Sequence, residues 1–157
     1  SQEVIELLQS IGIDLTQTDV YSKVRVGKVI LLADPDEDGK HINTLVLTLL
    51  YKYVPKLFSQ GKVYIVYAYE YTASFNGKRI FGHSVDDIKK QCKGKTPSDI
   101  LHLKGWGECP PELLRHLAFN PETRQLIKIQ APSKSGSKEF ELIMSEDTAY
   151  RKQMLGV

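Results

Sequence analysis

The feature that most constrains this chain is an apolar run that ends abruptly in alternating carboxylates. Residues 28–33 form the run, and Asp34, Asp36 and Asp38 follow it at every second position before a long apolar segment begins. A continuous apolar run is typical of a parallel strand that is covered on both faces. The sequence therefore predicts a buried strand, then an acidic turn (residues 34–38), then a helix.

The three aspartates of the acidic turn repel one another, and something must offset that repulsion. Two like charges a few ångströms apart repel by about 1 kcal/mol in water and by about 4 kcal/mol at an effective dielectric near 20. A hard divalent cation with oxygen ligands would offset this energy, and so would a raised carboxylate pKa. The alternative is a solvated turn at a helix N-terminus, where the helix dipole favours carboxylates. That alternative explains one or two acids, so three at this spacing favour metal binding.

The spacing D-x-D-x-D-G also begins the calcium loop of an EF-hand. Two features argue against that site. The last ligand position of such a loop would be Leu45 instead of a bidentate Glu, and the preceding residues are β-like instead of an amphipathic helix. We therefore do not expect an EF-hand.

The segment after the acidic turn predicts a βαβ unit. Between residues 40 and 58 the apolar side chains leave a thin polar stripe at four-residue spacing, which indicates a helix with most of its surface buried. The stripe consists of Lys40, Thr44, Thr48 and Lys52. Pro55 should kink or end this helix, and residues 63–68 form a second β-rich run. Ligands of such sheets bind beyond the carboxyl ends of the strands, where the acidic turn lies.

Shorter elements are expected in the rest of the chain. They are a helix in residues 1–12, a loop in 14–25, hairpin strands 71–75 and 78–81 around Asn76-Gly77, a helix from Ser84 to Lys93, a strand in 100–103, a glycine-rich loop around Trp106, a helix from Pro110 to Leu117, a helix start at Asn120-Pro121, a β-like run in 126–129, an apolar run in 140–144 and a last helix capped by residues 145–147.

The composition fits an ordinary globular chain of 157 residues, with 41% hydrophobic and 25% charged residues. The formal charge of +2 does not establish a nucleic-acid partner, although Lys89, Lys90, Lys93 and Lys95 form a basic run that is either a solvated face or a phosphate contact.

Two isolated cysteines indicate neither a zinc site nor a disulfide framework. With no signal peptide or apolar span, we expect a cytoplasmic location and no membrane contact.

Several stretches, in one order along the chain, resemble the TOPRIM region of type IIA DNA topoisomerases, as in the B-type subunits of gyrase and topoisomerase IV. They are Ser1–Val4, Asp34–Ile42, Gly61–Ile65, Leu103–Glu108, Asn120–Arg124 and Phe140–Met144. The resemblance implies an α/β fold, with a Rossmann-like TOPRIM core and a parallel sheet in residues 1–109. It also implies a β-hairpin insertion at 70–82 and a C-terminal α+β tail in residues 110–157.

The resemblance further implies an ATP-dependent enzyme that cuts both strands of one DNA duplex, passes another duplex through the gap and reseals the first. In the family, the positions of Asp34, Asp36 and Asp38 hold Mg²⁺ beside the scissile phosphate, and those of Asp34, Asp36 and His41 are catalytic. The positions of His41, Lys104, Gly105 and Trp106 lie near DNA. Without the resemblance, His41 is better explained as a solvent-facing residue of the first helical turn.

One family motif is missing from this sequence. The TOPRIM region of the family begins with E-G-[DN]-S-A, whose glutamate completes the site, and no Glu-Gly pair occurs in this chain. We therefore expect it to act with a chain that carries the glutamate motif and the ATPase domain, and with an A-type subunit that carries the catalytic tyrosine. Two explanations remain open, a natural split and a part of a longer B-type chain. Pro35 and Trp106 stand where the family usually has Ala and Leu, which suggests a divergent member such as a phage enzyme.

Two other functions remain open from the sequence. A stand-alone TOPRIM nuclease or primase-like protein would need a glutamate motif of its own. A non-catalytic module that binds DNA or a protein partner would no longer use its acidic turn.

Overall fold

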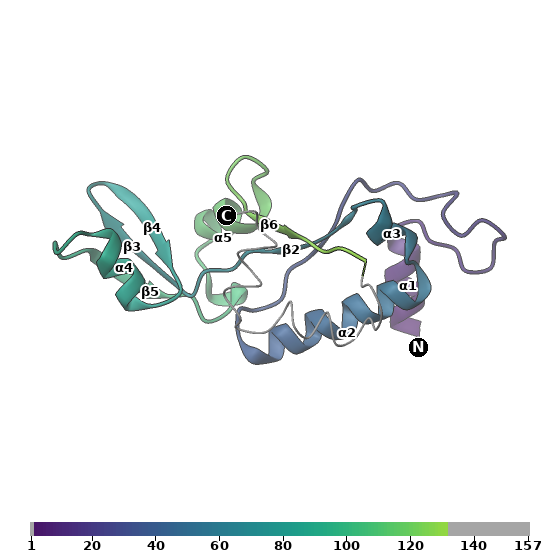
Figure 1. Ribbon diagram of the computed structural model, residues 1–157, viewed down its shortest axis with the longest axis horizontal. Helices are drawn as coiled ribbons and strands as arrows, with labels where there is room; N and C mark the ends of the chain where they lie inside the picture. The colour runs from purple at the N-terminus through teal and green to yellow at the C-terminus, as the bar shows by residue number, and fades with distance from the viewer. Residues whose placement is uncertain (1, 132–157) are drawn as a thin grey trace.

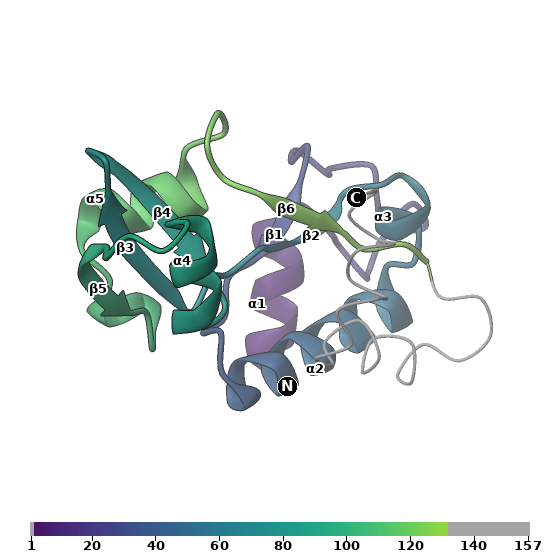
Figure 2. The same ribbon diagram turned by 60° about the vertical axis from the view of Figure 1, so that its left-hand side comes forward.

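The computed structural model describes residues 2–131 and forms two small sheets along one long axis (Figure 1). In chain order its elements are α1 (Gln2–Ser10), β1 (Val29–Leu31), α2 (Glu37–Tyr53), α3 (Lys56–Ser59), β2 (Val63–Val66), β3 (Tyr71–Phe75), β4 (Lys78–Gly82), α4 (Val85–Gln91), β5 (Ser98–His102), the 3-10 turn η1 (Trp106–Glu108), α5 (Pro111–Leu114), the π-helical turn η2 (Arg115–Phe119) and β6 (Leu126–Lys128). Figure 2 shows the second sheet grouped with α4 and α5, apart from the first sheet.

The first sheet contains the predicted βαβ unit and has the strand order β1-β2-β6. Strands β1 and β2 are parallel, with Val29 opposite Val63 and Leu31 opposite Ile65, and α2 connects them. Strand β6 pairs with β2 in the antiparallel sense, so the sheet is mixed instead of purely parallel. The predicted α/β class is confirmed.

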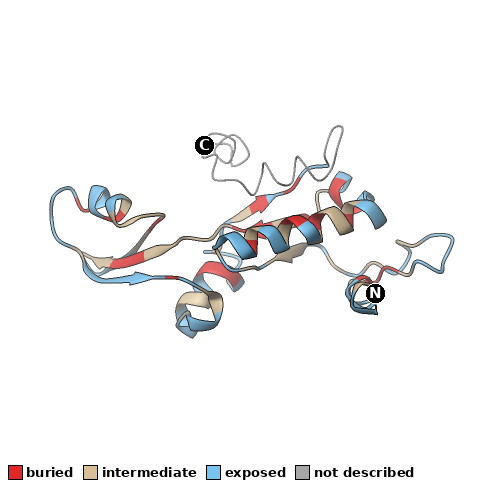
Figure 3. Ribbon diagram, turned by 90° about the horizontal axis from the view of Figure 1, so that it is seen from below, coloured by how far each residue is buried: buried red, intermediate tan, exposed pale blue. Residues whose placement is uncertain are grey.

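One hydrophobic core joins α2 to the first sheet. Along α2 the buried positions lie on one side and the exposed positions on the other (Figure 3). The fully buried members of this core come from the N-terminal segment, from α2 and α3, and from β2 and the β6 region. They include Leu8, Ile13, Leu47, Leu50, Val54, Leu57, Val63 and Ile129.

The predicted burial of β1 and α2 is wrong in part. All three residues of β1 are only half-buried, because within residues 2–131 this strand pairs on one edge alone. On α2, Ile42 and Leu45 are 54% and 56% exposed, whereas Thr44 of the expected polar stripe is buried. Thr44 can face the core because its hydroxyl donates to the Lys40 carbonyl oxygen at 3.0 Å, so no polar group is left unsatisfied.

The second sheet, in the order β4-β3-β5, contains the predicted hairpin. Asn76 and Gly77 have φ angles of 50° and 75°, as a two-residue type I′ turn requires. Strand β5 pairs with the other edge of β3. Helix α4 packs on this sheet, and the Ser84 hydroxyl caps it by accepting from the Asp87 backbone N–H at 3.1 Å. We call β3, β4, α4 and β5 together the end module.

The segment after the second sheet differs from its prediction. The expected helix from Pro110 divides into α5 and the π-helical turn η2. Asn120 and Pro121 do not start a helix, because the Asn120 side chain accepts from the Glu122 backbone N–H at 3.0 Å and forms a turn that leads into β6. The apolar run at 140–144 and the helix after Ser145 lie outside the described residues. No helix within residues 2–131 is long and apolar enough to cross a membrane.

The core can be tested with two leucines of the same helix. Leu47 is fully buried and Leu45 is 56% exposed. We expect Leu47→Ala to lower the free energy of unfolding by about 2–5 kcal/mol, because it removes buried apolar contacts and leaves a cavity. Leu45→Ala should change it by less than about 1 kcal/mol. Urea denaturation followed by circular dichroism measures both values, and equal losses would contradict this description of the core.

Candidate functional site

The acidic turn lies at the carboxyl end of β1, where it begins α2. Asp36 is the N-cap of α2, and its Oδ1 accepts from the Gly39 backbone N–H at 2.8 Å. Asp38 lies in the first turn of the helix, where a carboxylate is favoured by the helix dipole. Part of the acidic turn is therefore structural, as the capping alternative predicts, and the side chains of Asp34, Asp36 and Asp38 are all exposed.

Gly39 allows the start of α2 to lie directly against the backbone of Asp34. A Cβ atom at residue 39 would be 2.0 Å from the Asp34 carbonyl oxygen, which is far inside van der Waals contact. Any other residue at this position must move the chain that carries the first carboxylate. The glycine of D-x-D-x-D-G is thus needed for the shape of the turn.

The loop around Trp106 holds Asp34 from the other side. The Trp106 backbone N–H donates to Asp34 Oδ1 at 2.8 Å, and the indole Nε1–H donates to the Ala33 carbonyl oxygen at 2.8 Å. A Cβ atom on Gly105 would lie 3.3 Å from Asp34 Oδ2, so the loop approaches the carboxylate closely. Residues more than 70 positions apart in the sequence therefore form one site.

A small apolar cavity lies behind this loop. Its lining includes Pro35, Trp106, Tyr69, Leu103 and Cys109. Burial raises the pKa of the Tyr69 hydroxyl and of the Cys109 thiol above their usual values. The indole of Trp106 is half-buried against the protein, and its single N–H already donates to the Ala33 carbonyl oxygen.

The three carboxylates line one pocket, together with Leu32, Gly39 and Ile42. In the part of the chain that the structure describes, no three His, Cys, Asp or Glu side chains converge closely enough to hold a metal ion. This arrangement differs from an all-protein cage. It does fit Mg²⁺, which takes oxygen ligands, keeps several waters and binds through one or two carboxylates plus substrate phosphates. Asp34 and Asp36 each use Oδ1 for a backbone N–H and have a second oxygen on the exposed side chain.

His41 and Lys104, the other residues with a predicted role, are both exposed. Neither forms a hydrogen bond or ion pair with an acidic side chain within residues 2–131. Lys104 lies one residue before Gly105, beside the loop that holds Asp34. The structure thus brings the loop and Asp34 together, whereas His41 extends from α2 into solvent.

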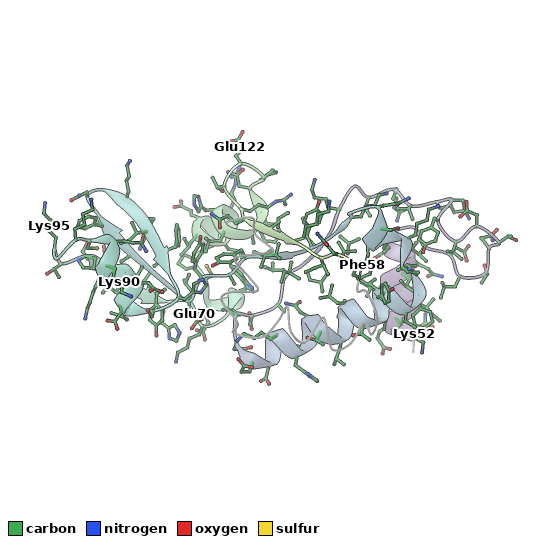
Figure 4. All side chains as sticks on the ribbon, in the orientation of Figure 1. Lys52, Phe58, Glu70, Lys90, Lys95 and Glu122 are labelled. Carbon is green, nitrogen blue, oxygen red and sulfur yellow. The ribbon has the colours of Figure 1, made fainter. Side chains whose placement is uncertain are left out.

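A second polar cluster, which the sequence analysis missed, lies beside Asp34. The Tyr67 hydroxyl lies 2.7 Å from His83 Nε2, and His83 Nδ1 lies 3.9 Å from Glu70 Oε1. These side chains line a pocket that Asp34 and Lys40 also line. Figure 4 shows Glu70 at the junction between the end module and the start of α2. The sequence did contain a signal for the contact between Glu70 and His83. A two-residue turn at Asn76-Gly77 pairs Tyr71 with Gly82, and the same register places residues 70 and 83 opposite each other.

Comparisons with known proteins first define the class. Residues 5–68 match the family model described as the Toprim domain. A Plasmodium falciparum topoisomerase II structure, described as its DNA-binding, cleavage and re-ligation domain, has a similar fold with a TM-score of 0.68 over 98% of this chain and 22% of that one, at 16% identity.

Sequence relatives identify the type of chain more closely. The DNA gyrase B subunit of Thermotoga maritima is 31% identical over 99% of this chain and 25% of its own length, and the DNA topoisomerase 4 B subunit of Haemophilus influenzae is 35% identical over 82% and 21%. The resemblance is therefore confirmed: this chain contains a Toprim region related to that of the gyrase and topoisomerase IV B subunits. It spans about a quarter of the length of these relatives.

The contact between Gly39 and Asp34 predicts a local effect that a fluorescence measurement can detect. Gly39→Ala should lower the free energy of unfolding by about 1–3 kcal/mol, because the new methyl group overlaps the Asp34 carbonyl. It should also shift the emission of Trp106, the only tryptophan, which hydrogen-bonds to Asp34.

Gly27→Ala is the matched control, since a Cβ atom at residue 27 would meet nothing within 4 Å. It should leave both the stability and the emission spectrum unchanged. A Gly39→Ala protein with the stability and spectrum of the Gly27→Ala protein would show that the turn does not need this glycine.

Proposed function

We propose that this chain provides the Mg²⁺-binding TOPRIM part of an ATP-dependent type IIA DNA topoisomerase. The observation that carries the proposal is the acidic turn at the carboxyl end of β1, with Asp34 held by the backbone of the Gly105-Trp106 loop. The similarity to gyrase and topoisomerase IV B subunits supports the same function. Double-stranded DNA is the proposed substrate.

Asp34, Asp36 and Asp38 are the proposed metal ligands, and each has a different support. Asp34 is oriented by the Trp106 N–H, Asp36 by the Gly39 N–H, and Asp38 by its place in the first turn of α2. When bound, Mg²⁺ would stabilise charge that develops on the phosphate oxygens and on the leaving 3′-oxygen. The fixed hydrogen bonds mean that Asp34 and Asp36 need little rearrangement to present an oxygen to the ion.

His41, Lys104, Gly105 and Trp106 are the proposed DNA-binding residues, with different tasks. Exposed Lys104 can pair with a phosphate, and exposed His41 can donate to a phosphate oxygen or carry a proton. Gly105 permits the close approach of the loop to Asp34. Because the Trp106 indole N–H donates to the Ala33 carbonyl oxygen, the proposed role of Trp106 is to position the loop beside the DNA.

The complete enzyme needs groups that residues 2–131 do not provide. We propose that the glutamate of the E-G-[DN]-S-A motif, the ATPase domain and the catalytic tyrosine are supplied by other segments or chains, and that ATP is used there. We retain the division into a TOPRIM part (residues 1–109) and a tail (residues 110–157) as a proposal, with β6 of the tail completing the first sheet. We also propose a cytoplasmic location, as expected for a bacterial enzyme like the relatives from Thermotoga maritima and Haemophilus influenzae.

Asparagine substitutions test the metal site with little change to the fold. Asp34→Asn and Asp36→Asn keep a side-chain oxygen for the Trp106 and Gly39 N–H groups, and Asn is as good an N-cap as Asp. Each should lower Mg²⁺-dependent DNA cleavage and relaxation by the assembled enzyme at least about 100-fold, or about 2.7 kcal/mol in the barrier. The variant Asp86→Asn, which changes an exposed acid of α4, is the control.

Activity of Asp34→Asn or Asp36→Asn equal to that of Asp86→Asn would refute the metal-site assignment. Nuclease activity in the purified chain alone would instead favour a stand-alone TOPRIM nuclease. An unchanged amide spectrum of Asp36 and Gly39 on Mg²⁺ titration, with DNA and partners present, would favour a non-catalytic binding module.

A further inference from the structure

The positive charge of this chain is concentrated in the end module. Residues 74–99 hold six of the 21 Lys and Arg side chains but only three of the 19 acidic ones. The remaining residues therefore contain 15 basic and 16 acidic side chains, so the whole net positive charge comes from this segment. Its cations are Lys78, Arg79, Lys89, Lys90, Lys93 and Lys95, which we call the basic tip.

Strand pairing brings the basic tip to the end of the module that lies away from the acidic turn. Lys78 and Arg79 start β4 and pair with Phe75 and Ser74 at the end of β3. Ser98, which follows the Lys93–Lys95 turn, also pairs with Ser74. Figure 4 shows Lys90 and Lys95 at this end of the molecule.

The acids of the segment lie mainly at the other end of α4. Asp86 and Asp87 are in the first turn of the helix, and Asp87 Oδ2 accepts from the His83 backbone N–H at 3.2 Å. Only Asp99 lies beside the basic tip. The field at this end of the module is therefore positive.

The basic tip is exposed, and its scaffold is packed. All six cations are exposed, and none takes part in an ion pair within residues 2–131. Beneath them, Ile88 and Cys92 of the α4 region are fully buried. Gln91 Nε2 also donates to the Phe81 carbonyl oxygen at 2.7 Å and ties α4 to β4.

Three lysines elsewhere in the molecule have intramolecular contacts that the tip lysines lack. The Lys52 ammonium lies 5.5 Å from the ring centre of Tyr53, and that of Lys56 lies 5.1 Å from the ring centre of Tyr21. Lys23 pairs with Asp14 at 4.0 Å. The charges of the basic tip are therefore available to an external anion, as is that of exposed Lys104.

The base of the end module adjoins the acidic turn. The Leu103 backbone N–H donates to the Glu70 carbonyl oxygen at 2.7 Å where β5 and β3 meet the core, and the Trp106 loop follows directly. The five residues of β3 then extend about 17 Å from this base. A duplex has one charge per about 1.7 Å of its axis, so this distance corresponds to about five base pairs.

We propose that the basic tip binds the sugar-phosphate backbone of duplex DNA several base pairs to one side of the scissile phosphate. This inference rests on the proposed function for its substrate, but it concerns a different surface from the acidic turn. The contact is with phosphates and is independent of base sequence. It places the flank of the duplex on the end module while the acidic turn faces the cleavage position.

Binding of two duplexes to the assembled enzyme tests this inference. One duplex ends about three base pairs from the cleavage position on each side, and the other is longer by about ten base pairs on each side. For the long duplex, the combined variant Lys90→Gln, Lys93→Gln and Lys95→Gln should weaken binding at least tenfold near ~0.1 M salt. The logarithm of its association constant should also fall less steeply with the logarithm of the salt concentration, with a slope about 2–3 smaller in magnitude. Binding of the short duplex should stay within about twofold of the original protein.

The matched control changes the same number of charges elsewhere, through Lys23→Gln, Lys52→Gln and Lys56→Gln. Lys52 lies at the opposite end of the molecule (Figure 4). The control should leave the slope for the long duplex unchanged. Equal slopes for the two combined variants, or a loss by the tip variant that is the same for both duplexes, would overturn the inference.

The same experiment separates this inference from the proposed function. The tip variant could bind the long duplex as tightly as the original protein does and still support Mg²⁺-dependent cleavage. That result would refute the proposed contact between the basic tip and DNA, and the proposed function would stand. If the original enzyme binds neither duplex, both are wrong. Melting curves of the tip variant should match those of the original protein, because the substituted side chains are exposed.

Discussion

The pair of hydrogen bonds from Trp106 to Asp34 and Ala33 is the contact on which the candidate site depends. It joins the carboxyl end of β1 to the loop that follows β5, and so connects the first sheet to the end module. A backbone N–H aimed at a carboxylate is a charge-assisted hydrogen bond, which is stronger than a neutral one. It fixes the carboxylate before any ligand arrives, and it fixes the orientation of the end module relative to the acidic turn at the same time.

The three aspartates of the acidic turn have different structural and chemical roles. Asp36 would be a good residue at this position even without a metal, because it caps α2. Asp34 lies before α2 and is held by the Trp106 backbone N–H, and Asp38 has only the helix dipole in its favour. Since the three do not converge in the described residues, a cation here depends on oxygens from water and phosphate as much as on the protein. Such a site gains most of its ligands only when the substrate is present.

Local signals in the sequence predicted much of this structure, and long-range pairing accounts for what they missed. Asn76-Gly77 and Pro55 act through their own backbone geometry and Ser84 through its hydroxyl, and the hairpin, the end of α2 and the cap of α4 lie where these residues indicate. The β-like run at 126–129 predicted β6 itself but not its antiparallel pairing, because its partner β2 lies about 60 residues earlier. The contact of Trp106 with Asp34 likewise follows from the packing of the end module. The exposure of Ile42 and Leu45 depends on which elements cover α2, which the periodicity of one helix cannot specify.

The half-buried edge strand β1 has a consequence for self-association. On the edge away from β2 its backbone has no strand partner among the described residues, and exposed Leu32 adjoins it. Such an edge is a template for another strand. If two copies of β1 paired in parallel, their acidic turns would meet and bring six aspartates together, which electrostatic repulsion opposes. The acidic turn therefore disfavours parallel pairing of two β1 strands, whereas a strand without such a cluster at its end would meet no comparable repulsion on this edge.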